Sequence, residues 1–85
     1  MRVTLRPSSG IPIVVSRKDQ EFHARRANAV DDVQICLGVD LFEVIAELAD
    51  LDLDSETGAA EATALAVEAQ RQLAGIAGIG PDGGA

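Results

Sequence analysis

Four acidic side chains have the spacing that could do the most chemistry in this chain. Asp50, Asp52, Asp54 and Glu61 occupy positions 1, 3, 5 and 12 of a 12-residue window. Carboxylates at this spacing can converge on a hard cation such as Ca²⁺, and the last glutamate can bind it through both oxygens. Helices are expected on both sides of the window, so a calcium site is one prediction.

The pattern resembles an EF-hand calcium loop, and with its flanking helices the resemblance covers about thirty residues. It departs from the motif at position 6, where the sharp turn needs glycine and the chain has Ser55, and at position 8, where Thr57 replaces an apolar residue. An acidic turn between two helices explains the same residues. We therefore expect no metal and no cofactor, and keep calcium binding as an alternative.

The remaining reactive side chains form no catalytic pattern. His23 is the only histidine and Cys36 the only cysteine. Cys36 lies in a predicted strand, which favours a buried, inert thiol over a nucleophile paired with His23. A single cysteine cannot form an internal disulfide and predicts a reducing, cytoplasmic location. We predict a protein that is not an enzyme, except as a subunit of a larger one.

The whole chain has a net charge of −7, but basic and acidic side chains are unevenly divided between its two halves. Residues 1–30 carry six basic side chains against two acidic ones, a net +4, whereas residues 31–85 carry twelve acidic side chains against Arg71 alone, a net −11. Each half could simply solvate its own surface. Alternatively, the molecule is dipolar, with one face for an anionic partner and one for a cationic partner.

Two helices joined by a short acidic turn are expected between Val39 and Ile76. The first, from about Leu41 to Asp50, is predicted to begin with Asp40 as its N-cap and Glu43 reaching back to it. Val39 and Val44 would form a hydrophobic staple. The apolar stripe of this helix comprises Leu41, Val44, Ile45, Leu48 and Leu51.

The second helix should begin at Asp54 or Ser55, although Gly58 weakens its first turn. Its apolar side chains are mostly small, which would allow a close approach to the first helix. Glycines and a proline should end it, at Gly75, Gly78, Gly80 and Pro81. The apolar stripe comprises Ala62, Leu65, Ala66, Ala69, Leu73 and Ile76.

Strands are expected in the first half of the chain. Residues 2–6 alternate apolar and polar side chains, residues 7–10 are turn formers, and residues 11–16 are β-branched, so residues 2–16 predict a hairpin. Residues 17–30 have helical propensity but few apolar side chains, and fit a short exposed helix or an ordered loop. Residues 33–37 predict a third strand that Gly38 closes.

The predicted fold class is α+β: a small antiparallel sheet, made of the N-terminal hairpin and a third strand, covered by a C-terminal helical hairpin. Residues 1–79 would form one small domain, and residues 80–85 a flexible Gly-rich tail. No apolar run is long enough to cross a membrane, and the N-terminal pattern leads us to expect no secretory signal. A core this small makes a homodimer or another homo-oligomer plausible.

These features favour a small acidic, non-catalytic protein-interaction module: an adaptor, inhibitor or accessory subunit whose acidic helical hairpin binds a partner protein, in particular a basic one. The alternative is a nucleic-acid-binding regulator of the antitoxin type that uses the basic N-terminal strand. The candidate contact residues are Glu43, Glu47 and Asp50 on the acidic side, and Arg2, Arg6, Arg25 and Arg26 on the basic side.

Overall fold

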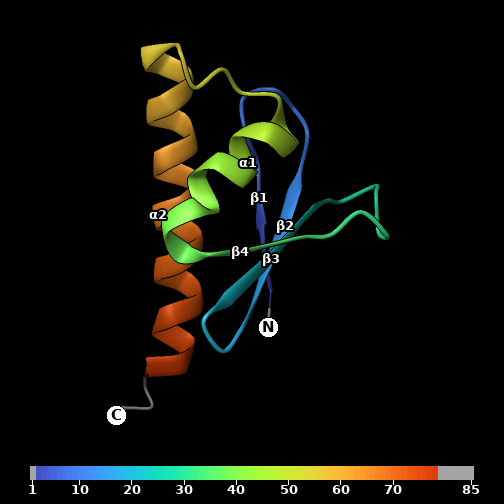
Figure 1. The fold of residues 1–85 in the computed structure, drawn as a ribbon, viewed down its shortest axis with the longest axis vertical. Coiled ribbons are helices and arrows are strands. Elements are labelled where there is room, and N and C mark those ends of the chain that lie inside the picture. Colours follow the sequence, from blue (N-terminus) through green and yellow to red (C-terminus); the bar gives the residue numbers. More distant parts are fainter. Residues whose placement is uncertain (1, 79–85) are drawn as a thin grey trace.

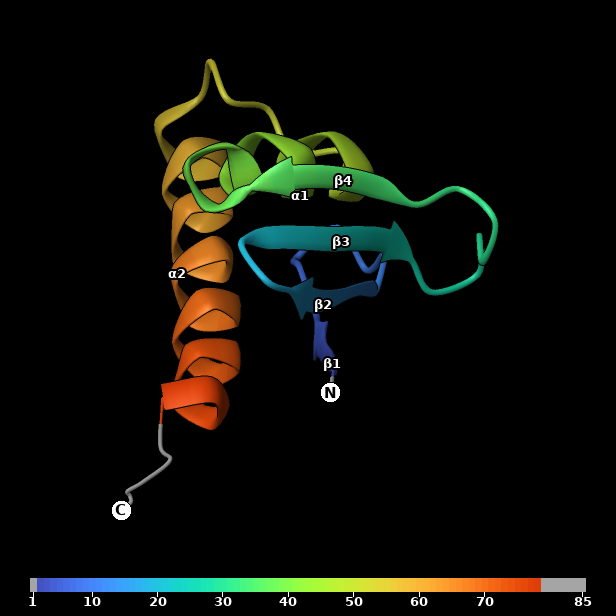
Figure 2. The ribbon, with the colours of Figure 1, turned by 60° about the horizontal axis from the view of Figure 1, so that its bottom comes forward.

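Four antiparallel strands form a single sheet in the computed structural model, which describes the backbone of residues 2–78 and the side chains of residues 2–73. The strands are β1 (Arg2–Leu5), β2 (Ile13–Lys18), β3 (Glu21–Arg26) and β4 (Gln34–Leu37). Each strand pairs with the next in the sequence, so the sheet order is β1-β2-β3-β4 (Figure 2). The predicted hairpin of residues 2–16 is the β1–β2 pair, in which Val3 faces Val15.

Two helices cover one face of this sheet. A short 3-10 turn, η1 (Gly38–Asp40), leads from β4 into α1 (Leu41–Ala49), and α2 (Glu56–Gly78) follows. Figure 1 shows α2 along one side of the molecule and the β3–β4 connection projecting on the other side. The predicted α+β class, with a helical hairpin over an antiparallel sheet, is confirmed.

The hydrophobic core lies between the sheet and the helices and is aliphatic. Alternate side chains of β1 and of the first half of β2 enter it, and α1 contributes Leu41, Ile45 and Leu48. Helix α2 contributes Ala66, Ala69 and Leu73. Because two of these three side chains are alanines, the backbone of α2 can lie close to its neighbours, as the sequence pattern predicted.

Residues 17–30 were predicted to be a short helix or an ordered loop, and this prediction was wrong. Most of the segment belongs to strands, the end of β2 and the whole of β3. Lys18 and Glu21 close a tight turn in which Asp19 has a positive φ of 57°. The segment has Glu, His, Ala and Arg rather than β-branched residues, so its propensity points away from a strand. Pairing on both sides, with β2 and β4, and burial of Phe22 and Ala24 outweigh that propensity.

Asp40 occupies the N-cap position of α1 as predicted, but the predicted capping interaction is absent. The Asp40 side chain makes no capping hydrogen bond, and its backbone is right-handed helical, with φ −101° and ψ −1°. An N-cap residue needs an extended backbone, and the preceding η1 turn prevents that at Asp40. Val39 is 77% exposed and therefore cannot form the predicted staple with Val44.

The start of α2 follows the prediction for Ser55. Its Oγ accepts a hydrogen bond from the Gly58 N–H at 3.3 Å, as an N-cap should. A Cβ on Gly58 would lie 2.1 Å from the carbonyl oxygen of Asp52. Glycine is therefore required there by the close approach of the interhelical turn.

Helix α2 continues through Gly75 to Gly78. The predicted tail, residues 80–85, lies outside the described residues, as does the side chain of Ile76. Neither helix in the described part of the chain combines the length and apolarity needed to cross a bilayer.

Candidate interaction surface

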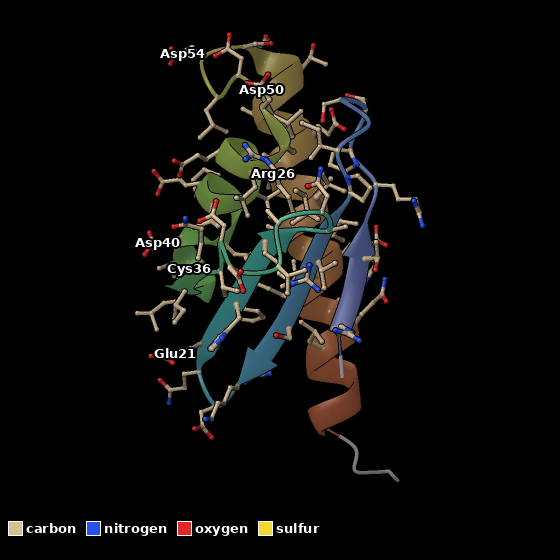
Figure 3. All side chains as sticks on the ribbon, turned by 90° about the vertical axis from the view of Figure 1, so that its right-hand side faces the viewer. Glu21, Arg26, Cys36, Asp40, Asp50 and Asp54 are labelled. Atoms are coloured by element: carbon tan, nitrogen blue, oxygen red, sulfur yellow. The ribbon has the colours of Figure 1, made fainter. Side chains whose placement is uncertain are left out.

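The face of the sheet opposite the helices is uncovered, and we call it the open face. Its side chains are those that alternate with the core residues along each strand. The register places Arg2 beside Ser16, Ser16 beside His23, and His23 beside Ile35, in one row across all four strands. Figure 3 looks onto this face, with α2 behind the sheet. The strand residues of the open face are Arg2, Thr4, Val14, Ser16, Lys18, Glu21, His23, Arg25, Ile35 and Leu37.

A hollow of about 150 Å³ lies on the open face. Its lining residues come from β1, β2, β3 and the segment before β4: Arg2, Val14, Ser16, His23, Arg25 and Val33. None of these residues is acidic. Two of the predicted basic contact residues, Arg2 and Arg25, are thus brought together around one concave spot, although they are far apart in the sequence.

Apolar side chains continue the open face along its edge strand. Val33, Ile35 and Leu37 are 43%, 59% and 52% exposed, and we call these three residues the apolar strip. A second, more open hollow adjoins the end of the strip, lined by Gln20, Leu37, Gly38, Val39 and Gln70. The Gln70 amide fixes this corner by donating a hydrogen bond to the Gly38 carbonyl at 2.8 Å.

The sequence prediction missed this strip as a candidate site. Val33, Ile35 and Leu37 alternate with Gln34 and Cys36, which is the pattern of a half-buried strand. The natural expectation is that the three larger apolar residues face the core. In the structure Gln34 and Cys36 take the inner side and the larger residues face outward. The predicted burial of Cys36 already implied this orientation, but its consequence for the apolar neighbours was missed.

Arg26, by contrast, is occupied within the molecule. Its side chain points to the helical side of the sheet, where Nε donates a hydrogen bond to the carbonyl of Leu48 at 2.7 Å. That carbonyl is in the last turn of α1, where a cation complements the helix dipole. Arg26 therefore holds the end of α1 and is a structural residue. Arg6 is exposed just beyond the end of β1.

The predicted acidic contact residues lie on the outer side of α1. Asp40, Glu43, Glu47 and Asp50 are all exposed, and their spacing of three, four and three residues places them on one side of the helix. We call these four residues the acidic stripe. Figure 3 labels two of them, Asp40 at the left and Asp50 near the top of the molecule. Asp50 also ends α1 with a left-handed backbone, at φ 60°.

Two of the four acidic residues in the predicted calcium-binding window accept hydrogen bonds from within the chain. Glu61 accepts hydrogen bonds from the Ser8 N–H at 2.5 Å and from the Ser8 hydroxyl at 2.7 Å, which ties the β1–β2 turn to α2. These bonds lower the pKa of Glu61. Asp52 Oδ1 accepts a hydrogen bond from the Asp54 N–H. Within the described residues, no three His, Cys, Asp or Glu side chains gather so as to hold a metal ion.

Cys36 and His23 lie on opposite faces of the sheet and cannot act together. Cys36 pairs with Phe22 on the helical side, whereas His23 pairs with Ile35 on the open face. Burial raises the pKa of the Cys36 thiol, and the Asp40 carboxylate adds to the rise. A thiol with a raised pKa is mostly protonated at neutral pH and is a poor nucleophile.

These two surfaces, the cationic and apolar open face and the acidic stripe, are the candidate sites that the geometry provides. Comparison of the chain with protein-family models, with curated proteins and with solved structures finds no match.

Proposed function

We propose that this protein is a small non-catalytic interaction module that docks a partner protein on the open face of its sheet. The observation that carries the proposal is the apolar strip, in which Ile35 and Leu37 are more than half exposed on an edge strand. Full burial of an isoleucine or leucine side chain contributes about 1.5–3 kcal/mol. Covering both residues would therefore contribute substantially to the affinity for a partner.

The charges of the open face as a whole indicate the chemistry of that partner, although the direct cross-strand neighbour of Leu37 is the acidic Glu21. Arg2, Lys18 and Arg25 stand on the open face against Glu21 alone. Electrostatic complementarity steers association and favours partners of opposite sign. We therefore commit to a partner segment that carries apolar side chains flanked by acidic ones.

The acidic stripe is the contact surface that the sequence predicted for a basic partner. It remains a second surface of the same module. Nucleic-acid binding by the open face is the second candidate function, because the register gathers Arg2 and Arg25 on one face. That binding would weaken steeply with added salt, because phosphate contacts release counterions.

The test is capture of the partner from the source lysate with tagged protein, at low and moderate salt, followed by binding measurements with the purified partner. The double variant I35S/L37S should reduce affinity by about tenfold or more, because each serine removes most of an apolar contact. Val67→Ser is the matched control: Val67 is also more than half exposed, but it lies on α2.

Other outcomes decide between the surfaces. Equal affinity of I35S/L37S and the parent protein would overturn docking on the strip. Loss of binding only in Glu43→Lys and Glu47→Lys would assign the contact to the acidic stripe. Recovery of nucleic acid that Arg2→Gln and Arg25→Gln abolish would favour the second candidate. Size-exclusion chromatography of both proteins shows whether the partner is a second copy of this chain.

A further inference from the structure

We propose that the 150 Å³ hollow on the open face binds a single oxyanion, either a phosphate or a carboxylate group. The hollow is several times the roughly 30 Å³ that a water molecule occupies in the liquid, so it has room for such a group. Its polar lining consists of two arginines, a serine and a histidine. All four side chains can donate hydrogen bonds to an oxyanion.

The strand register brings these donors together. Arg2 is the direct cross-strand partner of Ser16, and Ser16 is that of His23. Direct partners on one face of a sheet have Cβ atoms roughly 4.5–5.5 Å apart. Arg25 follows His23 on the same face of β3. A guanidinium presents its N–H groups as a planar fork that matches the paired oxygens of a carboxylate or phosphate.

The Arg25 side chain is already held in place. Its Nη1 donates hydrogen bonds to the carbonyls of Arg26 at 3.2 Å and Ala27 at 3.1 Å. Its other guanidinium nitrogens make no hydrogen bond within the described residues. A fixed side chain loses less entropy when a ligand binds, so this geometry favours binding. Arg2 has neither a hydrogen bond nor an ion pair among the described residues.

His23 is the fourth polar residue that lines the hollow, and one of its ring nitrogens is unpaired within the described residues. Its Nε2 is closed off from solvent and has no hydrogen-bond partner in the described structure. The nearest acidic atom, Oε1 of Glu21, is 3.9 Å away, which is too far for a hydrogen bond. Because a solvent-inaccessible atom cannot touch a ligand in an open hollow, His23 would donate from Nε2 to the anion only after its ring turns.

This inference deepens the proposed function and rests on it in one respect, because a docked partner would be the source of the anion. The hollow and the apolar strip can nevertheless be tested separately. The hollow is tested with small anions on the protein alone, whereas the strip is tested with the partner and I35S/L37S. Either test can fail while the other succeeds.

The experiment is an NMR titration of the isotope-labelled full chain with sodium phosphate and, separately, with sodium acetate. Sodium chloride keeps the ionic strength constant. We expect saturable shifts of the Arg2 and Arg25 Nε–H signals and of the Ser16 and His23 amides. Comparison of the two anions shows whether the site prefers phosphate or carboxylate.

The variants make the test specific. Arg2→Gln and Arg25→Gln should each weaken binding by about tenfold, the loss of one charge-assisted hydrogen-bonding group. Arg6→Gln removes the same charge at a residue that does not line the hollow, and should change affinity by less than about twofold, because exposed charges are screened. Since Arg25 also holds the β3–β4 connection, Arg2→Gln is the cleaner variant.

Two results would overturn the proposal. One is a linear, unsaturated shift that spreads equally over Arg6, Lys18 and the hollow, which would indicate general screening. The other is a saturable shift that Arg2→Gln and Arg25→Gln leave unchanged, although the variant spectra show a folded protein.

Discussion

Single side chains fix the relative positions of the elements in this small fold. Glu61 joins α2 to the β1–β2 turn through Ser8, and Arg26 joins β3 to the end of α1 through the Leu48 carbonyl. Both contacts link residues far apart in the sequence. They therefore stabilise tertiary structure rather than a single helix or strand.

The Glu61–Ser8 contact predicts a pH dependence of stability. The folded-state pKa of Glu61 is lowered by the hydrogen bonds from Ser8, so folding favours its charged form. The resulting stabilisation is fully present above about pH 4.5, the ordinary pKa of a glutamate, and is lost as the pH falls through the lowered folded-state value.

The measurement is urea unfolding between neutral and acidic pH. The Glu61→Gln variant should be less stable than the parent at neutral pH, and the difference should shrink as the pH falls. Glu68→Gln, also on α2, is the control, because Glu68 accepts its hydrogen bond from Gln72 of the same helix. A constant gap between Glu61→Gln and the parent at all pH values would contradict the assigned role.

Arg26→Gln should destabilise the fold by about 1–2 kcal/mol, since a partly buried, charge-assisted hydrogen bond and a favourable helix-dipole contact are lost. Arg26→Lys keeps the charge but not the Nε donor, and should recover part of that loss. Urea unfolding gives the free energies, and hydrogen exchange shows whether the amides at the end of α1 open first. An Arg26→Gln protein as stable as the parent would show that the Leu48 carbonyl is equally well satisfied by water.

At the level of elements, the interhelical turn and α2 depend on a glycine. Alanine is normally better than glycine inside a helix by about 1 kcal/mol. At Gly58 we expect the opposite, because the added Cβ would overlap the Asp52 carbonyl oxygen, 2.1 Å away. Gly58→Ala should lower the free energy of unfolding by about 1–3 kcal/mol, as overpacking usually does.

Thermal unfolding of Gly58→Ala and of Thr57→Ala checks this prediction. Thr57 is the exposed neighbour of Gly58, and its replacement by alanine should leave the melting temperature equal or slightly higher. A Gly58→Ala variant that melts above the parent would mean that the turn from Asp52 to Ser55 moves freely away from α2.

The elements also show which structure could be predicted from the sequence. The helices and the β1–β2 hairpin were predictable because their apolar periods of 3.6 and 2 coincide with burial. Strand β3 was not, because its turn, Asp19-Gln20, lacks the glycine that usually marks a two-residue hairpin. Only Phe22 and Ala24 give β3 an alternating apolar pattern. The segment forms a strand because it pairs with β2 on one side and β4 on the other.

The candidate site was predictable only in part, for a similar reason. Charge counts identified Arg2 and Arg25, but only the strand register shows that they line the same hollow while Arg26 turns to the other face. Two adjacent arginines on a strand necessarily point in opposite directions. The alternation along β4 indicated that one set of side chains is buried and the other exposed. By itself it did not indicate that Ile35 and Leu37 belong to the exposed set.

At the level of the whole molecule, charge follows the two layers. The open face carries more basic than acidic strand residues, whereas the exposed side of α1 carries the acidic stripe. Within the described residues, no arginine or lysine side chain forms an ion pair with a carboxylate. The acidic stripe and the basic side chains around the hollow thus lie on different surfaces, although Asp31 and Asp32 precede the apolar strip and Arg26 lies on the helical side.

This separation should have a measurable cost in stability. Asp40, Glu43, Glu47 and Asp50 repel one another at helical spacing, and each such like-charge pair costs about 0.2–0.5 kcal/mol. Glu47 also lies in the last turn of α1, where the helix dipole disfavours an anion. Glu47→Lys turns the repulsion from the neighbouring carboxylates into attraction, and places a favourable cation at the C-terminal end of the helix. It should raise the free energy of unfolding by about 0.5–1.5 kcal/mol at low salt.

Urea unfolding at low salt and at about 1 M salt, where the Debye length is roughly 3 Å, separates this effect from changes in packing. The gain in Glu47→Lys should largely disappear at high salt, and Glu47→Gln should show about half of it, since only repulsion is removed. A loss of stability in Glu47→Lys, or a gain independent of salt, would contradict the repulsion.

If the charges do repel one another, then the native acidic stripe opposes the stability of the fold. Natural proteins commonly accept such a cost at surfaces that serve a function, so the same variant should then be measured against the captured partner.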